Sequence, residues 1–85
     1  MNDWKFRIRA FAGSRHGMAP LGVLLFETVH GTESSAAVEI DACKSRMKRG
    51  EIEHAELIDL RPQGRLTNLN ISENTIIPWS WILNK

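Results

Sequence analysis

Cysteine is nearly absent from this chain of 85 residues, which contains a single cysteine, Cys43. A single thiol excludes a disulfide within the chain and any metal site built from paired cysteines. The absence of disulfides is typical of proteins in a reducing compartment. A fold of this size must therefore be held together by an apolar core without covalent cross-links.

Long apolar runs are also missing. The best run, Leu21–Phe26, is far too short to cross a bilayer. The start of the chain is charged between Asp3 and Arg9 and lacks the apolar centre of a signal peptide. We therefore expect a cytoplasmic protein with no membrane partner.

Charges of neither sign are in clear excess. The chain has 11 basic and 10 acidic residues, giving a net charge of +1, so nucleic-acid binding would have to depend on local clustering. Apolar residues make up 42% and charged residues 25%, which is typical of a folded globular domain. The length suffices for one modest core, so we predict a single domain over residues 1–85.

Basic and apolar residues alternate near the N-terminus. Successive side chains of a strand point to opposite faces, so this pattern predicts a strand over Trp4–Ala12 with one apolar face in the core. The other face carries cations and an aromatic ring: Lys5, Arg7, Arg9 and Phe11. Unpaired cations are costly to bury, so this face is expected to meet solvent or a binding partner.

A loop over residues 13–20 leads to a second predicted strand, Leu21–His30. Both alternating sets of side chains in its first half are apolar, which favours a strand covered on both faces or central in the sheet. Because the loop matches neither of the glycine-rich phosphate-binding motifs, we interpret it as a hairpin loop. Its Arg15 is placed at the rim of the candidate binding surface.

The clearest helical pattern follows Gly31. Thr32 is a suitable N-cap, with Ser34 and Ser35 as alternatives. Apolar residues then recur at helical spacing: Ala36, Ile40, Cys43 and Met47. Basic residues in the last turns complement the helix dipole, and Gly50 is placed to end the helix in a left-handed conformation.

Three further strands are predicted after the helix, over Ile52–Arg61, Leu66–Ile71 and Thr75–Leu83. A proline–glycine turn at residues 61–64 separates the first two, and Pro78 restricts the last to a sheet edge or breaks it. The order β-β-α-β-β-β predicts an α+β fold in which one helix packs on an antiparallel or mixed sheet of four to five strands.

Trp79 and Trp81 would share one face of an extended C-terminal strand. One of them is expected in the core, because a small chain needs large aromatic side chains there. An exposed tryptophan would mark a surface for a partner or for self-association. The candidate binding residues are therefore Lys5, Arg7, Arg9, Phe11, Arg15, Trp79 and Trp81.

No constellation typical of catalysis or metal binding is recognisable. Ser14 and His16 lack a third group to orient the histidine. The three histidines are scattered, whereas a structural zinc site needs about four ligands. We therefore predict no enzymatic activity, no cofactor and no metal site.

Binding functions remain. The main hypothesis is a non-enzymatic protein-binding domain acting by surface complementarity toward an acidic or nucleic-acid-binding surface. Size and element order favour, by analogy at the level of fold alone, small phage or mobile-element inhibitors of host defence or regulatory complexes, such as anti-CRISPR proteins. The alternative is a small nucleic-acid-binding domain that uses the basic sheet face. A homodimer joined by edge strands that end in Trp79 and Trp81 is compatible with either.

Overall fold

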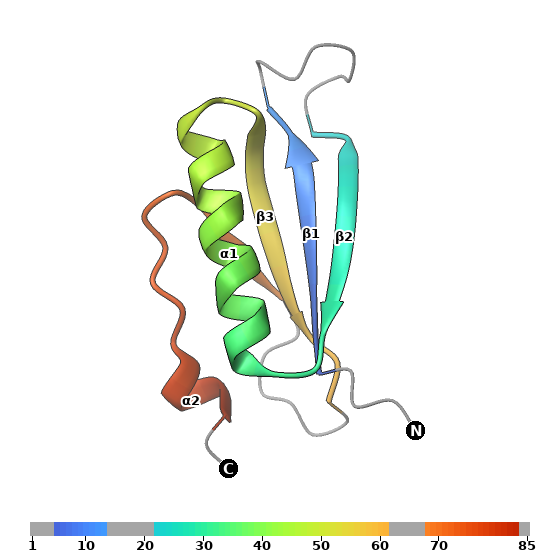
Figure 1. Cartoon of the computed structure of the whole chain (residues 1–85), viewed down its shortest axis with the longest axis vertical. Coiled ribbons are helices and arrows are strands. Elements are labelled where there is room, and N and C mark those ends of the chain that lie inside the picture. The colour runs from blue at the N-terminus through green and yellow to red at the C-terminus, as the bar shows by residue number, and fades with distance from the viewer. Residues whose placement is uncertain (1–4, 14–21, 62–67, 84–85) are drawn as a thin grey trace.

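The computed structural model describes residues 5–13, 22–61 and 68–83. The elements follow in the order β1 (Phe6–Ala12), β2 (Leu24–His30), α1 (Glu33–Lys48), β3 (Ile52–Asp59), β4 (Leu69–Ile71) and α2 (Trp79–Leu83). The strands form one four-stranded sheet in the order β2-β1-β3-β4, and each neighbouring pair is antiparallel. The long helix α1 lies across one face of this sheet (Figure 1), which confirms the predicted α+β class.

The central strand β1 has two different faces. Phe6, Ile8, Ala10 and Ala12 are fully buried and belong to the core. The residues between them are half-buried and point to the other side of the sheet. The alternation read from the sequence is therefore present in the structure.

Helix α1 begins and ends as its sequence predicts. The Thr32 side chain accepts a hydrogen bond from the Ser35 backbone N–H at 3.1 Å, which satisfies one of the free donors of the first turn. Ala36, Ile40 and Cys43 are buried against the sheet. Gly50 follows the helix with φ of +76°, a left-handed conformation that glycine adopts at little cost.

Strand β2 lies at an edge of the sheet and exposes Leu24 and Val29, so the prediction of a strand covered on both faces or central in the sheet was wrong. A bulge explains the misleading apolar run. Leu24 pairs with Phe11 and Phe26 pairs with Ala10, so Leu25 is an extra residue in β2. Leu25 and Phe26 consequently both pack against the core, although a regular strand would send one of them to each face.

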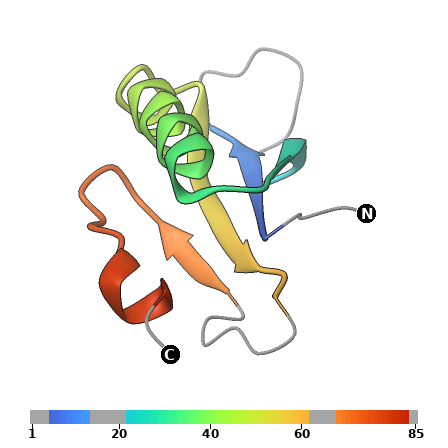
Figure 2. The same ribbon diagram turned by 60° about the horizontal axis from the view of Figure 1, so that its bottom comes forward.

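The predicted last strand, Thr75–Leu83, was also wrong. Residues 75–78 form neither a strand nor a helix, and α2 begins directly after Pro78. Proline lacks the N–H that a strand interior needs, but it is well suited to the start of a helix. The sheet consequently has four strands, and a loop leads from β4 to the short helix α2 (Figure 2).

Buried contacts attach α2 to the sheet. Ile82 is fully buried, and the Trp79 and Phe6 rings make a T-shaped contact with their centroids 5.5 Å apart. Arg61 donates two hydrogen bonds to the buried Asp59 carboxylate, at 2.8 and 2.9 Å, and a third to the Ile82 carbonyl at 2.6 Å. This bidentate pair also raises the pKa of Arg61 above its usual value, chiefly through the hydrogen bonding.

Two predicted connections lie mostly outside the described residues. They are the loop over residues 13–20, of which Gly13 is described, and the turn over residues 61–64, of which Arg61 is described. Gly13 itself lies where two backbones meet, since a Cβ there would come within 2.7 Å of the Gly50 carbonyl oxygen. Among the residues that the structure describes, no helix is long and apolar enough to cross a membrane.

Candidate functional site

The first candidate site is the sheet face opposite α1, and we call it the open face. Residues that pair directly in antiparallel strands point to the same side, so the register defines its members. They are Arg7, Arg9 and Phe11 from β1, Leu24, Glu27 and Val29 from β2, His54, Glu56 and Ile58 from β3, and Asn70 from β4. Both described helices pack against the other face, through Ile40 and Cys43 from α1 and Trp79 from α2.

One end of the open face is apolar and aromatic. Phe11 lies between Leu24 and His54, and its ring stacks on the His54 ring with a centroid distance of 4.7 Å and an interplanar angle of 11°. Leu24 is 45% exposed. This row therefore presents a leucine beside a pair of stacked rings.

The middle of the open face is charged. Glu27 attracts two arginines, with Arg9 Nε at 3.4 Å and Arg7 Nε at 4.0 Å from its carboxylate oxygens. Glu56 lies opposite Arg9 on the other side. Such partly exposed ion pairs contribute little to stability, about 0–1 kcal/mol. The sequence predicted a basic face, but in the structure this face carries both positive and negative charges.

The other end of the open face combines an arginine with aliphatic side chains. Arg7 lies between Val29, which is 38% exposed, and Ile58. The Nε atom of Arg7 is buried, and within the described ranges it has no hydrogen-bond acceptor. A separation of 4.0 Å from Glu27 is too long for such a bond. The guanidinium of Arg7 therefore has unused hydrogen-bonding capacity.

The structure unites some of the predicted binding residues and separates others. Arg7, Arg9 and Phe11 share the open face, and Lys5 is exposed just before β1. Arg15 lies outside the described residues. Trp79 and Trp81 belong to α2 and do not share a strand face, because that segment is helical. Trp79 contacts Phe6 on the core side, whereas Trp81 is 49% exposed.

Sequence reasoning missed the contributions of β2 and β3 to this face, above all Leu24, Val29 and His54. Residues 27–30 show no regular alternation of polar and apolar side chains, so this half of β2 carries no period-two signal. The pairing of His54 with Phe11 depends on the strand register and on a bulge between Phe11 and Ala12. The sequence alone carries no signal for that register.

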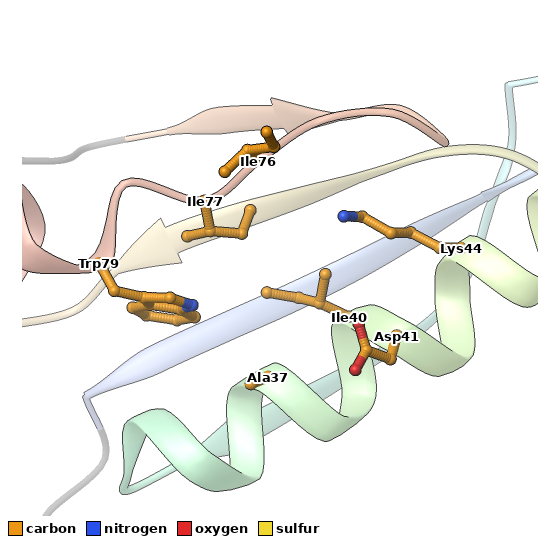
Figure 3. A pocket seen from close by; sticks show the side chains of 7 residues that line it. All are labelled: Ala37, Ile40, Asp41, Lys44, Ile76, Ile77 and Trp79. Atoms are coloured by element: carbon orange, nitrogen blue, oxygen red, sulfur yellow. The ribbon is translucent and has the colours of Figure 1, made fainter.

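The second candidate site is a hollow between α1 and the segment that precedes α2, and we call it the helix groove. It has a volume of about 250 Å³. Figure 3 shows Trp79 at one end and Lys44 at the other. Its lining residues are Ala37, Ile40, Asp41, Lys44, Ile76, Ile77 and Trp79. The Lys44 ammonium donates a hydrogen bond to the Thr75 carbonyl, which holds the segment beside α1.

The thiol and imidazole groups near the core are buried or hydrogen-bonded within the fold. Burial raises the pKa of the Cys43 thiol to about 11, assisted by the nearby Glu39 carboxylate, so this thiol is not an activated nucleophile. His30 is hydrogen-bonded to Ser35 at 2.6 Å and to Thr28 at 2.7 Å, which ties the end of β2 to the start of α1. No three His, Cys, Asp or Glu residues lie close enough to hold a metal ion within ranges 5–13, 22–61 and 68–83.

The two surfaces offer apolar side chains and charged groups. No family model matches the chain, and neither a curated protein nor a solved structure matches it significantly.

Proposed function

We propose that this chain is a protein-binding domain whose contact surface is the open face. One observation supports this most strongly: Arg7 and Arg9 share a sheet face with the exposed apolar side chains Leu24 and Val29, and neither described helix covers that face. Aromatic residues and arginine are enriched in protein interfaces, where apolar area provides affinity and charged groups provide specificity.

The composition of the open face defines the chemistry of the partner. Leu24 and Val29 require apolar side chains opposite them. The planar guanidinium of Arg7 pairs best with a carboxylate, which it can contact through two parallel hydrogen bonds. The partner we propose is therefore an acidic protein surface that places a carboxylate opposite Arg7 and apolar side chains opposite Leu24 and Val29. In its finer form, the proposal is that the chain acts as an inhibitor by occupying such a surface on a defence or regulatory complex.

Nucleic-acid binding is the second candidate, and Phe11 is the observation that favours it. An aromatic ring beside arginines on a sheet is a typical platform for stacking bases. The two glutamates of the open face, Glu27 and Glu56, oppose this reading because they repel phosphates. The His54 ring also covers one face of Phe11.

Capture of partners from a lysate of the native cells tests the proposal with matched variants. Arg9→Glu and Leu24→Asp alter the open face. Lys48→Glu makes the same change of charge as Arg9→Glu at an exposed position on α1, outside the open face. Each captured sample is treated with nuclease and quantified by mass spectrometry, and circular dichroism confirms that the variants are folded.

We expect a protein partner that is still captured after nuclease treatment and that binds the original chain and Lys48→Glu equally. The amount captured by each of the two open-face variants should be at least about tenfold lower, since burying an unpaired charge is costly. Equal capture by all variants would contradict the proposal. Partners that vanish with nuclease, together with affinity that falls steeply as salt is added, would support the nucleic-acid candidate instead.

A further inference from the structure

We propose that the helix groove is the interface of a homodimer, in which each copy places Ile76 in the groove of the other. The apolar walls of the groove include Ile40, Ile77 and Trp79. Ile76 stands beside this hollow and is 88% exposed, more than any other large hydrophobic residue that the structure describes. A single exposed isoleucine is ordinary, but one next to an apolar hollow can fill the same hollow of a second molecule.

Two-fold symmetry makes this contact reciprocal. In a symmetric dimer the same patch is used by both copies, so a patch must complement itself. The helix groove meets this condition because it contains both the apolar side chain and the apolar hollow. Two copies related by such an axis bury two isoleucines that are exposed in the single chain.

The charges of the groove favour a second copy over a partner of one charge. Asp41 and Lys44 lie less than one helical turn apart, and both line the groove. Asp41 forms no ion pair with any residue in the described ranges, and Lys44 Nζ contacts the Thr75 carbonyl, an uncharged acceptor. When two α1 helices run antiparallel across the axis, Asp41 faces the partner's Lys44, and Lys44 faces the partner's Asp41.

This interface differs from the one that the sequence suggested. Pairing of C-terminal edge strands is not available, because Trp79 and Trp81 lie in α2. The helix groove also lies on the α1 side of the sheet, away from the open face. The dimer is thus independent of the proposed protein-binding function, and either can fail without affecting the other.

Sedimentation velocity from the low micromolar to the millimolar range tests the dimer. Ile76→Asp should weaken dimerisation at least about tenfold, because it would bury a carboxylate without a partner. Val38→Asp is the matched control, since Val38 is 70% exposed on α1 and does not line the groove. The original chain and Val38→Asp should dimerise equally. A monomer at all concentrations, or dimerisation unchanged by Ile76→Asp, would overturn the proposal.

Reversal of the two charges tests the geometry of the interface. Asp41→Lys and Lys44→Asp each place like charges opposite one another in a homodimer, so each variant alone should associate more weakly than the original chain. When the two variants are mixed, opposite charges face one another again, and native mass spectrometry should detect the heterodimer. A mixture of folded variants that stays monomeric would overturn the antiparallel pairing of α1 and with it the proposed interface.

Discussion

The two faces of β1 come from one strand of seven residues and have opposite properties. The face toward α1 consists of apolar side chains that are fully buried, whereas the open face carries arginines and a phenylalanine that stay half-buried. Core positions are restricted by packing, and exposed positions tolerate most substitutions. The comparison suggests that the core face supplies the stability of the fold and that the open face is available for binding.

The largest expected effect is on the core face. Ile8→Ala should lower the free energy of unfolding by about 2–5 kcal/mol, because it removes buried methyl groups and leaves a cavity. Ile8 is fully buried in one of the two inner strands, and its cross-strand neighbour Leu57 is fully buried as well. Urea denaturation measures this loss. A loss below about 1 kcal/mol would contradict the assignment of Ile8 to a tightly packed core.

The thiol of Cys43 tests whether the side of α1 that packs on the core face is as inaccessible to water as the core face itself. Its pKa is raised to about 11, chiefly because burial disfavours the thiolate, while the thiol of the unfolded chain ionises near 9.0. Between these values the unfolded chain loses its proton first and is favoured as pH rises. Stability should therefore be unaffected by this group below pH 9 and should fall by about 2 kcal/mol by pH 11.

A control isolates that thiol from the lysines, which titrate in the same range. Cys43→Ala lacks the group, so the difference in unfolding free energy between the original chain and the variant should change with pH only above about 9. Thermal or urea unfolding at several alkaline pH values measures this difference. A difference that does not change with pH would show that Cys43 is accessible to water, and the contrast between the two faces would weaken accordingly.

Local sequence signals predicted the parts of the fold that depend on neighbouring residues. Thr32 capped α1, Gly50 ended it, and the alternation in β1 separated a core face from an open face, as expected. The errors came from interactions that are distant or irregular. The bulge at Leu25 produces an apolar run in the sequence that is also typical of a strand covered on both faces. Pro78 broke the expected last strand and allowed α2 to form instead.

The candidate site shows the same division. The sequence placed Arg7, Arg9 and Phe11 on one face, because the strand period is a local property. It did not show that Glu27 would lie beside both arginines or that His54 would stack on Phe11, since these contacts depend on the register between strands. The expectation that Trp79 and Trp81 share one face assumed a strand. It was wrong because this segment is helical.

The smallest expected effect is on the open face, one residue from Ile8. Arg9→Ala removes an ion pair of 3.4 Å between side chains that are each more than one-third exposed. Such pairs contribute little, so the free energy of unfolding should change by no more than about 0.5 kcal/mol, measured by the same urea denaturation as Ile8→Ala. A loss above about 1 kcal/mol would mean that Arg9 is held in place by the requirements of the fold. In that case its presence on the open face would no longer argue for binding, because stability alone would account for it. A small loss shows that the fold does not require Arg9, which is the condition that a side chain kept for binding must meet.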